Sequence, residues 1–359
     1  MSGTNIKLNQ LRQPEKIDKG LAIKEAVLFI LPPVIITVSS ILLFSLLNWF
    51  TAEQYNSFVT LIFLALIPSL LGTAAFQAII YRIIDENRKA VNNAAIKSFL
   101  YGSIFAIIFT AAVGGLAYGF WKYFGLTQMD FLWFAVLLFL FTVIWIYMAI
   151  FWASRQFYYP VTIIALGYLL ILAITLGFHL ITPEYTIIGY TLGIFLLFIM
   201  AAAALLRVFS PALKRKSAHF KISLTAIIRN NMSIILLSIL YILAIFLDKI
   251  IVWVFRGSQV GAIFLIPGPY TVGSFLGLIP IFAVVAAIFF GRATSQLLEK
   301  RYEGTLVEIK RRADRYLKMY RASLGFLLTV WAVFFMIVVV GEMFETQYST
   351  QEVFGQAKQ

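Results

Sequence analysis

The sequence predicts an all-α, polytopic membrane protein with about nine transmembrane helices. Of its 359 residues, 61% are hydrophobic and only 13% are charged, and the mean hydropathy is +0.91. Soluble domains carry about 25% charged residues, so this composition excludes a soluble enzyme and a disordered scaffold. Nine apolar runs reach the ~20 residues needed to cross a hydrocarbon core. They occupy residues 26–48, 57–81, 98–120, 131–153, 160–181, 187–207, 233–254, 271–290 and 323–343.

The runs divide into two predicted lobes. A polar arm at residues 1–25 precedes the first run, which is too long for a signal-peptide core and which we expect to remain as a helix. Six runs form a first lobe at residues 26–207, and a cytoplasmic linker at 208–231 separates them from a second, partial lobe of three runs at 232–359.

Lysine and arginine set the expected orientation. With a cytoplasmic N-terminus, the cytoplasmic side holds all of the 29 lysines and arginines except Lys122, Lys249, Arg256 and Lys358. This bias follows the positive-inside rule and predicts a multi-pass protein of the cytoplasmic (inner) membrane. The net charge of +13 is then an inner-face charge, which suits anionic lipid headgroups better than nucleic acid.

Two cytoplasmic segments have helical patterns. In the linker, Leu224, Ile227 and Ile228 recur at helical spacing, which fits a helix on the membrane surface or an ordinary loop. Residues 291–322 carry an apolar stripe with basic residues on the other faces. We expect a short amphipathic helix, a break at Gly304 and a longer helix that continues into the ninth run. This segment either lies in the interface or docks a cytoplasmic partner, and the residues expected to contact headgroups or the partner are Arg292, Arg311, Arg312 and Arg315.

Polar residues inside the runs mark a candidate pathway. Asp248 and Lys249 lie within the seventh run, where each charge costs roughly 2.5–3.5 kcal/mol at mid-bilayer. Such residues normally face protein or water, so the pair either lines a pathway or makes a structural contact between helices. Gln77 in the second run and Trp253 near the end of the seventh are weaker candidates for the same path.

Proline supplies a second signal, because it lacks the amide proton that the helix ladder needs and can kink a transmembrane helix. Pro68 lies in the second run and Pro280 in the eighth. Bends at these positions would suit transport, although proline is also common in membrane helices generally.

The sequence offers no apparatus for catalysis. It contains no cysteine and only two histidines, His179 and His219, and it lacks a Walker lysine loop, an HExxH and a GxSxG motif. We therefore expect neither an enzyme nor a bound cofactor or metal.

Several stretches resemble a known family. They are residues 145–154 (WIYMAIFWAS), 247–253 (LDKIIVW), 266–270 (IPGPY), 274–280 (SFLGLIP) and 302–309 (YEGTLVEI). Together they are similar to the Pel exopolysaccharide transporter family, PelG, loosely over most of the chain and well over residues 240–322.

The resemblance implies an inner-membrane transporter of the flippase superfamily that includes lipid-linked oligosaccharide exporters and multidrug antiporters. Members have two six-helix lobes around a central cavity, and they work with a cytoplasmic glycosyltransferase and a cyclic-di-GMP-responsive membrane partner. On this mapping Asp248 and Lys249 lie in the first helix of the second lobe. Pro269, Tyr270 and Pro280 mark a gate or turn.

The chain departs from the family pattern in three places. The family has an aspartate where this sequence has Thr271, and an acidic residue is replaced around Arg292. The family also has about a dozen helices, so nine runs leave the second lobe incomplete and suggest that the last three helices are missing.

The sequence therefore predicts an exporter of an amino-sugar-rich exopolysaccharide that works by alternating access. The alternatives are a lipid-linked oligosaccharide flippase, a cation-coupled drug antiporter, and a scaffold of a polysaccharide synthase complex that transports nothing.

Overall fold

The computed structural model describes the middle of the chain most fully. The described residues are 28, 31–32, 34–36, 38–40, 42–43, 46, 52–87, 90–123, 128–182, 185–210, 224–240, 242–243, 258–260, 263–265, 317, 321, 325 and 332. Structural statements below concern these residues.

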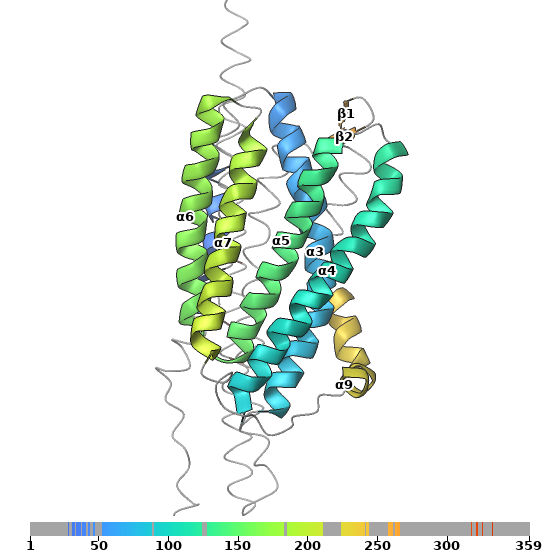
Figure 1. Ribbon diagram of the computed structural model, residues 1–359, viewed down its shortest axis with the longest axis vertical. Coiled ribbons are helices and arrows are strands. Elements are labelled where there is room, and N and C mark those ends of the chain that lie inside the picture. Colours follow the sequence, from blue (N-terminus) through green and yellow to red (C-terminus); the bar gives the residue numbers. More distant parts are fainter. Residues whose placement is uncertain are drawn as a thin grey trace, which may run out of the picture.

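Five long helices form an up-and-down bundle (Figure 1). They are α3 (Ala52–Glu86), α4 (Val91–Tyr123), α5 (Gln128–Ala153), α6 (Tyr158–Ile181) and α7 (Thr186–Phe209). Each contains a segment long and apolar enough to cross a membrane. These five helices match the second to sixth predicted runs.

The other four predicted runs lie partly or wholly outside the described residues, so the predicted count of nine stays a prediction. In the first run, the described positions between 28 and 46 are helical. In the seventh run, residues 233–240 and 242–243 are helical.

The C-terminal end of α3 and the N-terminal end of α4 extend beyond the predicted runs. α3 continues to Glu86 and α4 begins at Val91, so Arg82 and Lys97 lie inside helices rather than in a loop. A helix can continue past the hydrocarbon core, because its backbone hydrogen bonds do not depend on the surrounding lipid. The Asn87 side chain donates to the Ile83 carbonyl at 2.7 Å and satisfies one carbonyl of the last turn of α3.

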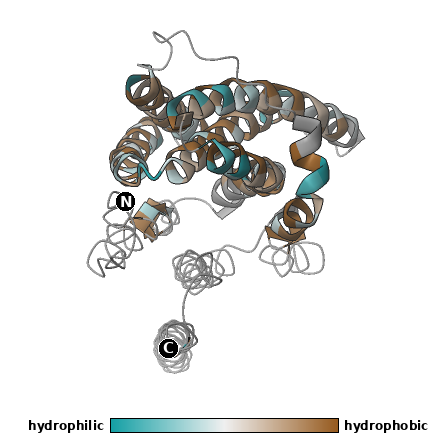
Figure 2. Ribbon diagram, turned by 90° about the horizontal axis from the view of Figure 1, so that it is seen from below, coloured by the Kyte–Doolittle hydropathy of each residue, from teal (hydrophilic) through white to brown (hydrophobic). Residues whose placement is uncertain are grey.

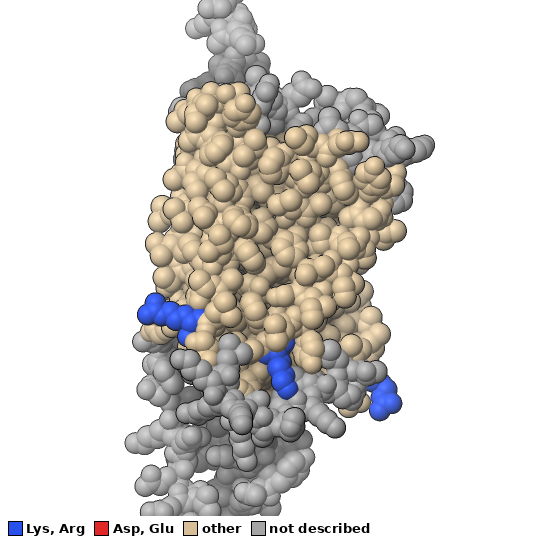
Figure 3. All heavy atoms as spheres, viewed as in Figure 1, with Lys and Arg blue, Asp and Glu red and all other residues tan. Residues whose placement is uncertain are grey.

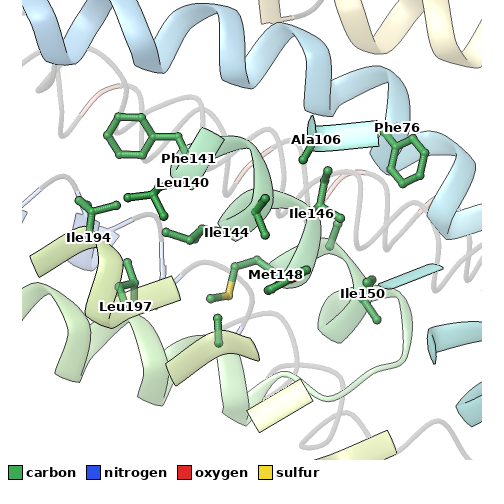
Figure 4. Packing of buried hydrophobic residues seen from close by; sticks show 14 of the residues in the cluster. Phe76, Ala106, Leu140, Phe141, Ile144, Ile146, Met148, Ile150, Ile194 and Leu197 are labelled. Carbon is green, nitrogen blue, oxygen red and sulfur yellow. The ribbon is translucent and has the colours of Figure 1, made fainter. Parts of the chain in front are cut away.

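Helix α5 is the centre of the bundle. It is apolar on all sides, as expected for a helix surrounded by protein, and 78% of its most apolar window is buried, against 17% in α4. Figure 4 shows its side chains between Ile194 and Leu197 of α7 on one side and Phe76 of α3 and Ala106 of α4 on the other. The outer helices turn leucine and isoleucine outward, and seen from below the described helices are mostly hydrophobic on their outer faces (Figure 2).

Glycines allow α6 and α7 to approach closely. A Cβ atom built on Gly193 would lie 2.7 Å from the backbone Cα of Ile171, and one on Gly189 would lie 2.8 Å from the Cβ of Phe178. Gly189 and Gly193 form a GxxxG pair, which is typical of close transmembrane helix packing. Beside the turn that connects α6 to α7, the Nδ1 atom of His179 lies 2.5 Å from the Thr186 hydroxyl oxygen. This contact joins the two helices.

The turn between α5 and α6 uses a left-handed residue. Arg155 has φ 60°, a region that normally favours glycine. The Gln156 amide donates to the Phe151 carbonyl at 2.8 Å and the Arg155 amide to the Trp152 carbonyl at 3.1 Å. This pair of hydrogen bonds is a Schellman motif, which ends α5 by satisfying its last carbonyls.

The linker contains a short helix, α9 (Leu224–Asn230), that contacts α3 near the lower end of the bundle (Figure 1). Ile227 is buried in the core cluster, whereas Ile228 and Arg229 are exposed. At Asn231 the chain turns into the next helical segment, because the Asn231 side chain donates to the Ile227 carbonyl and its own carbonyl accepts from the Ile235 amide. The helix expected at this position therefore rests on the described bundle, against α3.

The described residues are otherwise almost all helical, as the all-α prediction requires, and one small antiparallel hairpin accompanies the helices. β1 (Ser258–Val260) pairs with β2 (Ile263–Leu265), and Val260 faces Ile263 across the ladder. The hairpin lies at the upper end of the bundle, near the start of α3 (Figure 1). Sheet edges are excluded from bare hydrocarbon because their backbone groups stay unpaired, so the end of the bundle is a suitable place for it.

We predict that Gly193→Ala destabilises the bundle, because the new methyl group would collide with the backbone of α6. Overpacking of this kind costs about 1–3 kcal/mol. The measurement is the apparent melting temperature in detergent, which should fall by several degrees.

The matched control is Gly177→Ala on α6, where a Cβ meets nothing within 4 Å. It should leave the melting temperature unchanged or raise it slightly, since alanine favours helix over glycine by up to ~1 kcal/mol. Equal effects of the two substitutions would show that close packing at Gly193 is unimportant.

Candidate functional site

Of the predicted site residues, only Gln77 lies among the described residues. The remainder lie outside them, so their roles stay predictions: Asp248, Lys249, Trp253, Pro269, Tyr270, Pro280, Arg292, Arg311, Arg312 and Arg315.

Gln77 continues a polar stripe along one face of α3. Ser69, Thr73 and Gln77 are spaced four residues apart and so lie on the same side of the helix. The Ser69 hydroxyl donates to the Leu66 carbonyl and the Thr73 hydroxyl to the Ser69 carbonyl, each at 2.7 Å, and both side chains are fully buried. Their hydrogen-bonding capacity is therefore used within α3.

The Gln77 side chain differs from its two neighbours. It is only half-buried, and its amide makes no hydrogen bond to another described residue. Gln77 precedes Arg82 by five residues, or about 8 Å along the helix. An amide at that depth is costly unless a polar group or water meets it, so Gln77 is suited to a polar passage.

A second polar contact joins α4 to α5. The hydroxyl groups of Ser103 and Tyr147 lie 3.2 Å apart, and the Tyr147 side chain is buried. Its ring lies 5.0 Å from that of Phe99 on α4 and 6.1 Å from that of Phe198 on α7. Sequence reasoning missed this contact, because a tyrosine in an apolar run carries no sign of the partner 44 residues away.

A third cluster connects four segments of the first lobe. The Ser40 side chain, from the first predicted run, hydrogen-bonds the Tyr168 hydroxyl of α6. Tyr190 of α7 packs edge-to-face against Phe58 of α3, with ring centroids 5.4 Å apart. The Ser40–Tyr168 contact joins the first run to α6, and the Phe58–Tyr190 contact joins α3 to α7. The only hint in the sequence is the presence of hydroxyl groups inside apolar runs.

Positive charge gathers at one end of the bundle, which we call the basic end: it comprises Arg82, Lys97, Arg155, Arg207 and Arg229. Figure 3 shows blue atoms near the lower end of the visible face and none on the wall above. Lys122, in the last turn of α4, is at the opposite end. The described segments thus repeat the charge bias that the sequence predicts.

The polar groups of the described part are few and largely engaged. Among the described residues, no three histidine or acidic side chains lie close enough to hold a metal ion. Hydroxyl groups such as those of Thr73, Thr142 and Thr175 donate to carbonyls of their own helix, and Gln77 adds a half-buried amide.

Comparison with solved structures identifies the fold. One similar structure is an outward-facing multidrug resistance MATE family transporter of the MOP superfamily, with a TM-score of 0.61 and 13% identity over 89% of this chain and 70% of that chain. Another is a MOP superfamily transporter from Pyrococcus furiosus, with a TM-score of 0.56 and 13% identity over 89% of this chain and 70% of that chain. At this identity the likeness concerns the fold alone.

Comparison of the sequence identifies the family. No curated protein matches the chain. The family model of PelG, described as "Putative exopolysaccharide Exporter (EPS-E)", matches residues 1–353, nearly the whole chain. With five apolar helices long enough to cross a membrane and a MATE-like fold, the chain is a multi-pass membrane transporter and belongs to the PelG family.

Proposed function

We propose that this protein exports an amino-sugar-rich, Pel-like exopolysaccharide across the cytoplasmic membrane by alternating access between two lobes. The match of the PelG family model to residues 1–353 carries the proposal. The MATE-like fold supports it, because transporters of this general kind rock two helix bundles around a central site.

The described helices supply one rigid lobe for such a movement. α5 is surrounded by α3, α4 and α7, and the glycine contacts between α6 and α7 leave little freedom inside the lobe. The linker ends in a turn at Asn231, whose buried side chain donates to the Ile227 carbonyl of α9 and whose backbone carbonyl accepts from the Ile235 amide of the next helical segment. A rigid bundle followed by a short turn suits rocking between lobes at residues 208–231.

The proposed orientation follows from charge, and the proposed partners follow from the family resemblance. We place the basic end in the cytoplasm, in accord with the positive-inside rule. The cytoplasmic segment 291–322 then faces a glycosyltransferase and a cyclic-di-GMP-responsive membrane protein, which would deliver the polymer to the transporter. Asp248 and Lys249 would lie on the path, where a carboxylate can bind a cationic sugar or a coupling ion.

We expect Asp248→Asn to reduce polymer export by about tenfold or more, since a hydrogen bond to a charged group contributes about 1.5–3 kcal/mol. The measurement is secreted polymer from a Pel-producing host that lacks its own exporter and is complemented with each variant. Asp130→Asn is the matched control, because Asp130 lies in the first turn of α5 at the opposite end from Arg155. Normal export by correctly inserted Asp248→Asn protein would remove the pathway role.

Gln77→Leu tests the first lobe separately. Loss of one amide contact to the polymer should lower export about fivefold, because a single hydrogen bond contributes about 1 kcal/mol. The same change at the exposed Gln156, in the turn before α6, should leave export unchanged. If Gln77→Leu exports normally while Asp248→Asn does not, the path bypasses this face of α3.

Reversal of Arg311, Arg312 and Arg315 to glutamate tests the partner surface. We expect co-purification of the glycosyltransferase to be lost, while replacement of the same three residues by lysine, which keeps the charge, retains it. Polymer or drug flux in vesicles containing the purified protein distinguishes the other possibilities. A partner interaction without any flux would favour a scaffold, and flux of drugs without polymer would favour an antiporter.

A further inference from the structure

A hollow lies between the beginning of α6 and the end of α7 at the basic end. Its volume is about 440 Å³, and the described residues that line it are Tyr159, Ala203, Ala204 and Arg207. Ala203 and Arg207 are four residues apart and share one face of α7. The small alanine side chains leave room between the helices, and the arginine stands at the end of that space.

The depth of the hollow matches the boundary between acyl chains and headgroups. Arg207 follows Thr186, the first residue of α7, by 21 residues, which corresponds to about 31 Å along the helix. A hydrocarbon core is about 30 Å thick, so Arg207 reaches headgroup level when the start of α7 lies at the other surface. Ala203 is one turn deeper, among the acyl chains.

The hollow opens on a wall that faces lipid. Leu166 of α6 and Ile199 and Leu206 of α7 are large apolar side chains with 50%, 43% and 42% of their surface exposed. Exposed residues of this kind continue along both helices away from the basic end. An occupant of the hollow therefore needs an apolar part that lies against them and a polar part that remains at the basic end.

The polar lining suits a phosphate group. Arg207 is exposed, and its planar guanidinium can donate two parallel hydrogen bonds to phosphate oxygens. The Tyr159 hydroxyl can donate a further one. Tyrosine is also common at the membrane interface, where its ring and hydroxyl meet apolar and polar surroundings.

We propose that this hollow is a binding site for an anionic glycerophospholipid of the leaflet at the basic end. The phosphate lies on Arg207 and Tyr159, and the glycerol and first acyl carbons cover Ala203. Charge complementarity selects a lipid with net negative charge over a zwitterionic one. The site is on the outer wall of the lobe and is separate from the polymer path.

The experiment is native mass spectrometry of the purified protein, titrated with phosphatidylglycerol or with phosphatidylcholine in detergent. The unaltered protein should retain phosphatidylglycerol preferentially. Arg207→Gln should lower its occupancy about fivefold, as expected for one basic residue at an anionic surface. Arg229→Gln, an exposed arginine of α9 that does not line the hollow, is the matched control and should change nothing.

Ala203→Leu tests the cavity itself, since the larger side chain narrows the hollow beside Arg207 and leaves the charge intact. It should lower phosphatidylglycerol occupancy to a similar extent, at an unchanged melting temperature. Equal loss in the Arg207→Gln and Arg229→Gln proteins would indicate general charge attraction and overturn the proposal. Full lipid retention by Ala203→Leu, or displacement of the lipid by equimolar inorganic phosphate, would overturn it as well.

Discussion

The absence of water from the hydrocarbon core is the constraint on which this structure depends. A buried polar atom without a partner costs several kcal/mol in lipid, so most such atoms find a partner inside the protein. Among the described residues, the buried hydroxyl oxygens of Ser98 and Thr110 are exceptions. The bundle meets this demand with short hydroxyl side chains that donate to carbonyls of their own helix, as at Thr142 and Thr175, each at 2.6 Å. These residues are polar, but their hydroxyl groups are hydrogen-bonded within their own helix. The surfaces that the helices present to one another are therefore apolar.

Association of those rods cannot rely on the hydrophobic effect alone, since lipid chains are as apolar as leucine. Close van der Waals packing supplies the attraction instead. Gly189 and Gly193 bring α7 against α6, and α5 fills the centre with large side chains such as Phe151 and Met148 that are fully buried. The few hydroxyl contacts between helices, such as Ser103 with Tyr147, then fix their register. The result is a lobe suited to move as one body.

The two ends of this lobe differ, and the difference connects structure to transport. The basic end carries the arginines, α9 and the hollow beside Arg207, whereas the opposite end carries the short hairpin β1–β2 and the His179–Thr186 contact. A lipid bound beside Arg207 would anchor the outer wall at one depth. On the proposed alternating-access mechanism, such an anchored lobe would be the frame against which a second lobe rocks.

The sequence by itself determined the class of protein, the positions of five described spans and the charge bias between their ends. These depend on local composition, because hydropathy over ~20 residues decides membrane insertion. It also identified Gln77 as a polar residue in an apolar run. The resemblance to the PelG family was visible in the sequence as well.

Only the tertiary structure decided which helix is central, that Ile227 of α9 is buried in the core rather than left on the membrane surface, and that Ala203 and Arg207 border a hollow with Tyr159. The GxxxG pair at Gly189 was visible in the sequence and was missed, but its partner helix was not visible. The physical reason is the same in each case, because these features arise from contacts between residues far apart in the chain. A run that is apolar on all sides does not indicate which of its faces packs against which other helix.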